Sequence, residues 1–210
     1  FKKDLDIARF FVEAKQKYGL PEKFRVAYAK NSENTVYEIG KLLTENDMQK
    51  GITLSRQTNN VVVAANVGRK NIDMGVYVNL QRKYSRKGIP TYTEMILGLP
   101  GETYQSFVDG LEGTLQSGFK NQIIVYPCQV YPNTQLGDKS YQKKFGIKTR
   151  RIQLQEAHSR EREAGLVPEY EEVITETSSM PARDWKKSTI VSYALQLFHG
   201  LRAGTYLLGY

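Results

Sequence analysis

Strand-like and helix-like segments alternate along this chain of 210 residues, and this alternation constrains its fold more than any other feature. Segments rich in β-branched and aromatic residues lie at residues 24–30, 51–57, 91–98 and 122–130. A repeat of about 30 residues suits strand–helix–strand crossovers. The pattern predicts an α/β fold with a mainly parallel sheet, which is compatible with either a doubly wound sheet or a barrel.

Apolar residues at helical spacing predict the helices that separate these strands. Thr103 is a plausible N-cap for one of them. The expected helices lie near residues 5–18, 36–43, 59–66, 73–87 and 103–115.

The last third of the chain departs from this regular order. A basic, turn-rich stretch at 132–151 precedes a predicted helix at 152–164, a candidate strand at 171–176 and a terminal helix at 181–199. We therefore expect two parts, with the α/β part at residues 1–135. Residues 136–210 form an extension that is mostly helical with one candidate strand.

Composition excludes some classes of protein. The apolar content is sufficient for a core, so global disorder is excluded. The longest apolar run, Asn60–Val67, is much shorter than the roughly 20 residues of a membrane helix, so we expect no membrane association. Lys and Arg exceed Asp and Glu by eight, which permits contact with nucleic acid without demonstrating it. A single cysteine, Cys128, fits a reducing compartment, and we expect a cytoplasmic protein.

Polar residues gather where the second predicted strand ends. Thr53, Ser55 and Gln57 share one face of this strand, whereas a strand buried on both faces should be almost entirely apolar. Parallel α/β folds bind ligands at the carboxyl ends of their strands. This face therefore indicates either a polar pocket or hydrogen bonds between neighbouring strands.

The third predicted strand carries Glu94 in its middle. A buried carboxylate needs a partner or a ligand, and Lys30 or Arg56 could be that partner. The strand ends at Gly98, within Gly-Leu-Pro-Gly-Glu-Thr, where glycines allow either close approach to a ligand or a tight turn. In the fourth strand, Pro127 has no backbone donor and predicts an edge or an irregular end.

Metal chemistry and thiol chemistry are not favoured by the pattern. His158 and His199 lie on different predicted helices, without other ligands at metal-binding spacing. No activating group is implied beside Cys128, so we expect an inert thiol.

Several segments resemble, in order, parts of radical S-adenosylmethionine (SAM) enzymes. Residues 88–103, which contain Gly-Leu-Pro-Gly-Glu-Thr, resemble their fifth strand and the turn after it. Residues 53–58, 68–72 and 126–134 are similar to the fourth strand, the loop after it and the sixth strand. The tail at 176–185 resembles members with an upstream cobalamin-binding domain.

The resemblance implies a fold and a set of cofactors. The fold would be a partial (β/α) TIM-like barrel at residues 1–135 that lacks its first two β/α units. The cofactors would be SAM and a 4Fe-4S cluster, with cobalamin-dependent methyl transfer as one option. The partners would be an unknown substrate and an electron donor for the cluster.

The resemblance also implies roles for individual residues. Ser55 and Gln57 would face the ribose or carboxylate of SAM. The strand from Glu94 through Ile96 to Gly98 would line its adenine and methionine side. In the fourth strand, the backbone near Tyr126 and Pro127 would meet the adenine edge.

The CxxxCxxC segment that binds the cluster in these enzymes is absent from this chain. Cys128 alone cannot replace three cysteines. We therefore expect Phe1 to be an internal position of a longer enzyme and the isolated chain to be inactive.

Two alternatives stay open. One is a non-catalytic basic scaffold or nucleic-acid-binding module on a degenerate barrel. The other is an unrelated barrel enzyme with Glu94 as acid or base. Exposed barrel edges predict weak stability or self-association, which a sharp, concentration-independent unfolding of a monomer would contradict.

Overall fold

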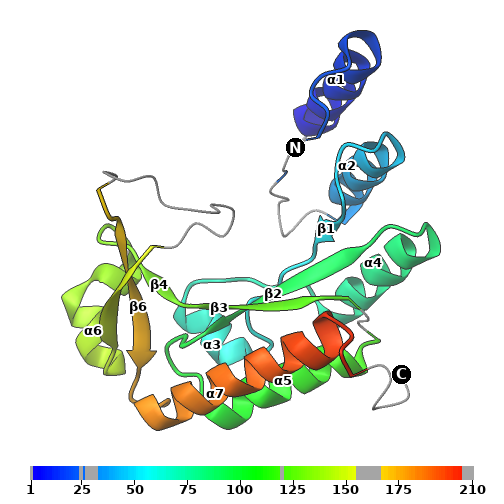
Figure 1. Ribbon diagram of the computed structural model, residues 1–210. Helices are drawn as coiled ribbons and strands as arrows, with labels where there is room; N and C mark the ends of the chain where they lie inside the picture. The colour runs from blue at the N-terminus through cyan, green and yellow to red at the C-terminus, as the bar shows by residue number, and fades with distance from the viewer. Residues whose placement is uncertain (1, 24–25, 27–32, 119–120, 155–166, 205–210) are drawn as a thin grey trace.

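The computed structural model is a curved molecule built on a short parallel sheet (Figure 1). The structure describes residues 2–23, 26, 33–118, 121–154 and 167–204. Helices α1 (Lys2–Tyr18) and α2 (Glu33–Glu45) stand at one end of the parallel sheet, and a small antiparallel sheet stands at the other. None of the described helices is both long and apolar enough to cross a membrane.

The parallel sheet has the order β1-β2-β3 and confirms the α/β class. Its strands are β1 (Ile52–Thr53), β2 (Thr91–Leu97) and β3 (Ile123–Pro127). As Pro127 predicted, β3 is an edge of this sheet. The strand predicted at 24–30 lies outside the described residues except for Val26, which is not in a strand.

The two faces of β2 differ in burial, residue by residue. Thr91, Thr93, Met95 and Leu97 are buried, whereas the residues between them are only half-buried. The buried face packs against helices α4 (Met74–Arg86) and α5 (Tyr104–Gln116) through large side chains. Those side chains are Tyr77, Tyr84, Phe107 and Leu111.

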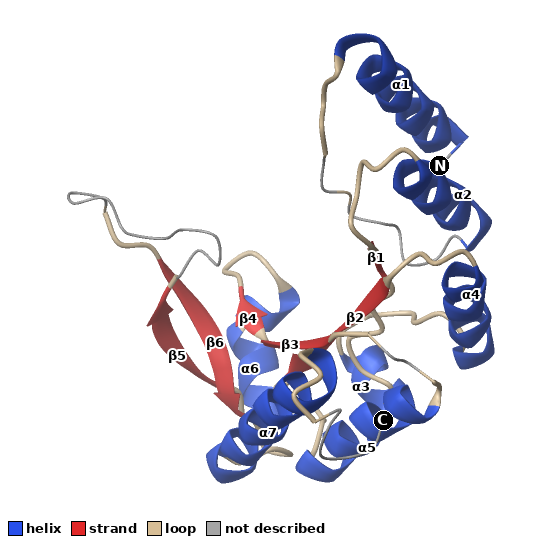
Figure 2. Ribbon diagram, turned by 45° about the vertical axis from the view of Figure 1, so that its right-hand side comes forward, coloured by secondary structure: helices blue, strands red, loops and turns tan. Residues whose placement is uncertain are grey.

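The opposite face of the sheet carries the candidate site, and we call it the inner face. It is defined by Tyr92, Glu94 and Ile96 of β2 and by Tyr126 of β3, which lies opposite Ile96 in the register. Helices α3 (Val61–Asn66), α4, α5 and α7 (Ala182–Leu195) all lie on the other side of the sheet (Figure 2). A parallel sheet is usually covered on both faces, so a half-buried inner face is a place for a ligand or a further chain segment.

Side-chain caps explain where the central helices begin. Asn60 and Asp73 accept hydrogen bonds from backbone N–H groups in the first turns of α3 and α4. Thr103 and Ser106 form a reciprocal capping box at α5, which confirms Thr103 as its N-cap.

The second sheet is antiparallel and has the order β4-β6-β5. Its strands are β4 (Gln129–Val130), β5 (Lys148–Gln153) and β6 (Tyr170–Glu176), and the last confirms the strand predicted there. The helix predicted from residue 152 is wrong at its start, because Ile152 and Gln153 belong to β5. Residues 155–164 of that prediction lie outside the described residues. Pairing with the distant β6 decides the structure of β5, and local periodicity does not reveal such pairing.

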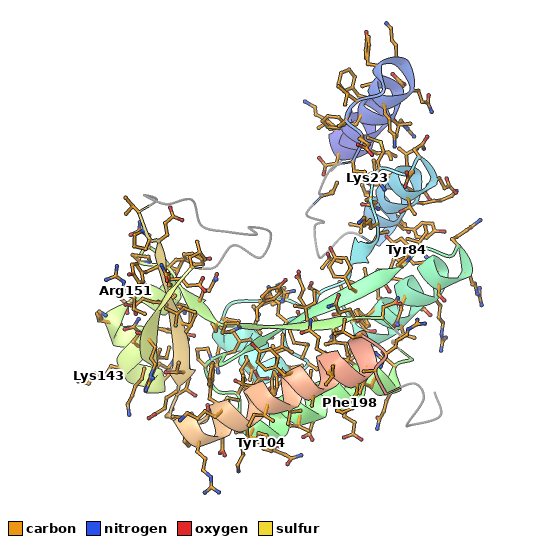
Figure 3. The ribbon with its side chains drawn as sticks, viewed as in Figure 1. Lys23, Tyr84, Tyr104, Lys143, Arg151 and Phe198 are labelled. Atoms are coloured by element: carbon orange, nitrogen blue, oxygen red, sulfur yellow. The ribbon has the colours of Figure 1, made fainter. Side chains whose placement is uncertain are left out.

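Shorter elements complete the chain. A 3-10 turn, η1 (Gln135–Gly137), and helix α6 (Lys139–Phe145) connect β4 to β5 within the antiparallel sheet. Helix α7 confirms the terminal helix and ends in a π-helical turn, η2 (Gln196–Gly200). It lies along α5, where the Lys187 ammonium is 5.5 Å from the ring centre of Tyr104 (Figure 3).

Candidate functional site

A β-bulge interrupts the first strand at the edge of the inner face. The Leu54 N–H donates to Tyr92 O, but the next bond to β2 comes from Gln57 N–H to Glu94 O. One extra residue is therefore accommodated between Leu54 and Gln57, and Gln57 takes a φ of 64°. The prediction of a strand through residue 57 is wrong in this respect, since regular pairing stops at Thr53 and Gln57 forms an isolated bridge.

The bulge places Ser55 beside Glu94. The Ser55 hydroxyl donates a 2.6 Å hydrogen bond to Glu94 Oε2. Lys30 and Arg56 are the two partners expected for Glu94. Lys30 lies outside the described residues, and Arg56 donates its hydrogen bonds to Asn59 and to the Ile72 carbonyl. Glu94 is half-buried and not fully buried, so part of the residue can be reached from the inner face.

Arg56 belongs to the helical side of the sheet. Its Nε donates to Asn59 Oδ1 at 2.7 Å, and its Nη1 donates to the carbonyl of Ile72 at 2.6 Å. Its guanidinium also lies 5.9 Å from the ring centre of Tyr77. Burial lowers the pKa of Arg56, although Tyr77 and Asp73 oppose this effect. Arg56 therefore holds the loops around the strand end.

Arg69, in the loop after α3, reaches the same strand end. Its Nη2 donates to the carbonyl of Ser55 at 3.1 Å, and its Nε donates to Asn71 Oδ1 at 2.6 Å. Burial lowers the pKa of Arg69, the positive charge of Arg56 adds to this, and Glu94 opposes it. The guanidinium and the Glu94 carboxylate thus interact electrostatically, yet no ion pair joins them among the described residues.

The buried carboxyl group of Glu102 is hydrogen-bonded to the residue that follows this strand end. Thr58 Oγ1 donates to Glu102 Oε1 at 3.0 Å, and Glu102 is only 1% exposed. Glu102 Oε2 has no hydrogen-bond partner in the described part of the chain. Burial raises the pKa of Glu102 to about 7, and the bond from Thr58 opposes that rise. Glu102 therefore ties the turn after β2 to the end of the bulge.

The remaining predicted site residues lie in β2, β3 and the turn after β2. Ile96 faces Tyr126 across the register, and Tyr126 is 45% exposed. Pro127 is opposite Leu97 at the end of β3. Gly98 has a φ of 95° and lies against β6 and α7, where an added Cβ would come within 3.3 Å of the Ile174 carbonyl. Only a glycine adopts this turn without strain.

Arg69 is the residue that sequence reasoning missed. Residues 68–72 resemble a loop of radical SAM enzymes, and this resemblance implies no role for any single residue of the loop. One feature of the sequence does point to Arg69. It directly follows Gly68, the glycine just after α3, and the loop that starts there runs back beside the end of the first strand.

Cysteine and histidine offer little chemistry at this site. Burial raises the pKa of the Cys128 thiol to about 12, and Glu102 adds to the rise. His199 Nε2 lies 3.0 Å from the Asn121 carbonyl, and His158 is outside the described residues. Among the described residues, no three His, Cys, Asp or Glu side chains gather in a way that could hold a metal ion.

The basic residues of β5 are partly neutralised by β6. Lys148 Nζ lies 2.6 Å from Glu176 Oε1. The Arg151 guanidinium is 4.2 Å from the ring centre of Tyr170, and Figure 3 shows Arg151 in the small sheet, with Lys143 on the neighbouring helix. The Lys148–Glu176 pair offsets one positive charge that a nucleic-acid surface would use, whereas the ring contact leaves the charge of Arg151 in place.

Known proteins resemble this chain in sequence and, more weakly, in structure. No protein-family model matches this chain. It is 36% identical over 199 residues to the cobalamin-dependent radical SAM methyltransferase TokK of Streptomyces tokunonensis. It is 35% identical over 199 residues to the 2-(S-pantetheinyl)-carbapenam-3-carboxylate methyltransferase of Streptantibioticus cattleyicolor. Each match covers 94% of this chain and 29% of the relative.

Among solved structures, the chain is similar to the radical SAM methyltransferase TsrM from Kitasatospora setae with cobalamin and a [4Fe-4S] cluster bound. The TM-score is 0.45 and the identity 15%, over 63% of this chain and 24% of that one. The sequence relatives confirm the resemblance to radical SAM enzymes: this chain is homologous to a segment of radical SAM methyltransferases, and it spans 29% of their length.

Proposed function

We propose that this chain forms the SAM-lining part of a cobalamin-dependent radical SAM methyltransferase. The observation that carries the proposal is the placement of the Ser55–Glu94 pair beside Arg69, where Ser55 follows the carboxyl end of β1 and Glu94 lies in the middle of β2. Homology to TokK over 94% of the chain supports the same reading. The methyl acceptor is not assigned.

The side chains at this strand end suit the parts of SAM. The Arg69 guanidinium can bind a carboxylate, and the Glu94 carboxylate can bind an ammonium group. Because these two charges interact without forming an ion pair, a zwitterionic amino-acid group between them would satisfy both.

The rest of SAM would be bound by residues next to this pair, some of them on the inner face and Gln57 just past the bulge, where it is bridged to Met95. The Ser55 hydroxyl and the Gln57 amide are suited to ribose hydroxyls. Ile96 and Tyr126 offer an apolar and an aromatic surface for adenine. When bound, SAM supplies the adenosyl radical and the methyl group of this enzyme class, and the protein orients and shields it.

The 4Fe-4S cluster does not fit the residues of this chain. Its single cysteine, Cys128, is buried and bonded within the fold, and the cluster requires several thiolates. We therefore assign the cluster ligands, and contact with an electron donor, to residues outside this chain. No residue here is assigned to cobalamin.

The open inner face supports a barrel whose other strands lie outside the described residues. In this proposal β1 is continued by further strands, β3 remains an edge, and the inner face becomes the interior. Residues 1–135 would form the barrel part and residues 136–210 the extension, although β4 pairs with β6 across that boundary.

The test is to read the coding sequence upstream of Phe1 and to assay the complete protein. We expect a CxxxCxxC segment, and, after anaerobic reconstitution with iron and sulfide, reductive cleavage of SAM and methyl transfer. A complete protein without further cysteines, which binds nucleic acid with steep salt dependence and does not bind SAM, would overturn the proposal in favour of a basic binding module.

A further inference from the structure

A cavity lies at the opposite end of the parallel strands from the candidate site. It has a volume of about 580 Å³ and is bounded by the last turns of α4 and α5 and the start of β2. This volume is within the range of small-molecule sites, about 300–1,000 Å³. The catalytic constellation of barrel enzymes lies at the other end, so this cavity is separate from it.

The charged residues that line the cavity are Arg82 of α4 and Arg202, which follows η2. Neither guanidinium has an ion pair among the described residues, and no described lining residue is a carboxylate. Arg202 has a φ of 56°, which is uncommon for a residue with a side chain, and its exposed side chain borders the cavity. Two unpaired guanidinium groups at one cavity favour an anion, and their planar donors match phosphate.

Uncharged polar groups that line the same cavity indicate the rest of the ligand. Gln81 is 8% exposed, and its buried Oε1 has no hydrogen-bond partner in the described residues. This oxygen is an acceptor, so it requires a donor from the ligand. Ser85, Ser117 and Asn121 add groups that both donate and accept.

We propose that this cavity binds a small phosphate ester that also carries hydroxyl groups. Arg82 and Arg202 hold the phosphate, and a ligand hydroxyl donates to Gln81 Oε1. The site would act in binding or regulation and not in the chemical step, since it lies at the amino ends of the strands. This inference does not rest on the proposed SAM site.

Calorimetric titration with ribose 5-phosphate, inorganic phosphate and ribose tests the proposal. We expect saturable binding of ribose 5-phosphate with a stoichiometry of one, weaker binding of phosphate, and no binding of ribose. The variants R82A and R202A should each weaken ribose 5-phosphate about tenfold, because each removes charge-assisted hydrogen bonds. Both side chains are exposed, so the fold should tolerate these changes.

The matched control is R183A, which removes the same charge from an exposed position of α7 away from the cavity. Retention of affinity in R183A supports a built site. An equal loss in R183A shows attraction to a basic surface only, and absence of saturable binding shows no site; either result overturns the proposal. If inorganic phosphate binds as tightly as ribose 5-phosphate, the sugar hydroxyls add no affinity, and the role given to Gln81 is wrong. SAM binding is measured in parallel, so that its failure is distinguished from failure of this site.

Discussion

The Ser55 hydroxyl donates a 2.6 Å hydrogen bond to the Glu94 carboxylate between two neighbouring parallel strands. The bulge before Gln57 makes this contact possible, because it adds one residue to the first strand at that point. The bond fixes one carboxylate oxygen of Glu94 and leaves the group half-buried on the inner face. The hydrogen bond therefore holds the Glu94 carboxylate in place beside the carboxyl end of β1.

Replacing Ser55 by alanine should weaken SAM binding by about tenfold, since Glu94 loses the hydrogen bond that orients it. The free energy of unfolding should fall by only about 1 kcal/mol. Equilibrium dialysis of SAM with the complete protein and urea denaturation measure the two effects. S192A is a suitable control, because within the described part of the chain the Ser192 hydroxyl donates to the Ser188 carbonyl of its own helix and to no other group. Equal SAM affinities in S55A and the parent would remove Ser55 from the site.

Replacing Glu102 by glutamine should remove a pH dependence of stability. Burial raises the pKa of Glu102 from 4.5 to about 7. As pH rises from about 4.5 to 7, the unfolded chain releases this proton while the folded chain retains it, so stability falls. The full loss above pH 7 is about 3 kcal/mol.

Urea denaturation at about pH 5 and pH 8 measures this effect. The parent should lose more stability than E102Q on going to the higher pH, and the variant should be the more stable at pH 8. An identical pH dependence in the two proteins would show that Glu102 does not retain its proton in the folded state.

Gly101 and Gly68 form a matched pair for testing the turn after β2. Both have positive φ, at 89° and 64°. An added Cβ at Gly101 would overlap Asn66 Nδ2, which donates to the Pro100 carbonyl at 2.9 Å, whereas Gly68 has nothing within 4 Å. G68A should cost about 1 kcal/mol, and G101A should cost at least about 1 kcal/mol more. Equal losses in thermal or urea unfolding would contradict this contact.

Replacing Arg56 by lysine keeps the positive charge but removes the guanidinium, which donates one hydrogen bond to Asn59 and another to the Ile72 carbonyl. A lysine cannot make both bonds at these positions, so we expect a loss of about 1–3 kcal/mol in stability. R183K, on an exposed surface, should be nearly neutral. A neutral R56K in the same denaturation series would show that Arg56 does not hold these loops.

Local pattern predicted most of the elements but not the details that build the site. The apolar stripes and the N-cap at Thr103 are local signals, and the structure confirms them. The bulge at Ser55 depends on how two strands pair, and the β5 strand depends on β6, so neither is encoded in local periodicity. Arg69 reaches Ser55 from 14 residues away through a loop path that spacing alone does not reveal.

The central claim is that the strand end carrying Ser55, Glu94 and Arg69 binds SAM. The most direct test is the SAM affinity of the complete, reconstituted protein as the parent, R69A and R183A. We expect R69A to bind SAM at least about tenfold more weakly than the parent, because a bidentate carboxylate contact is lost, and R183A to bind like the parent. Unchanged SAM affinity in R69A would contradict the account.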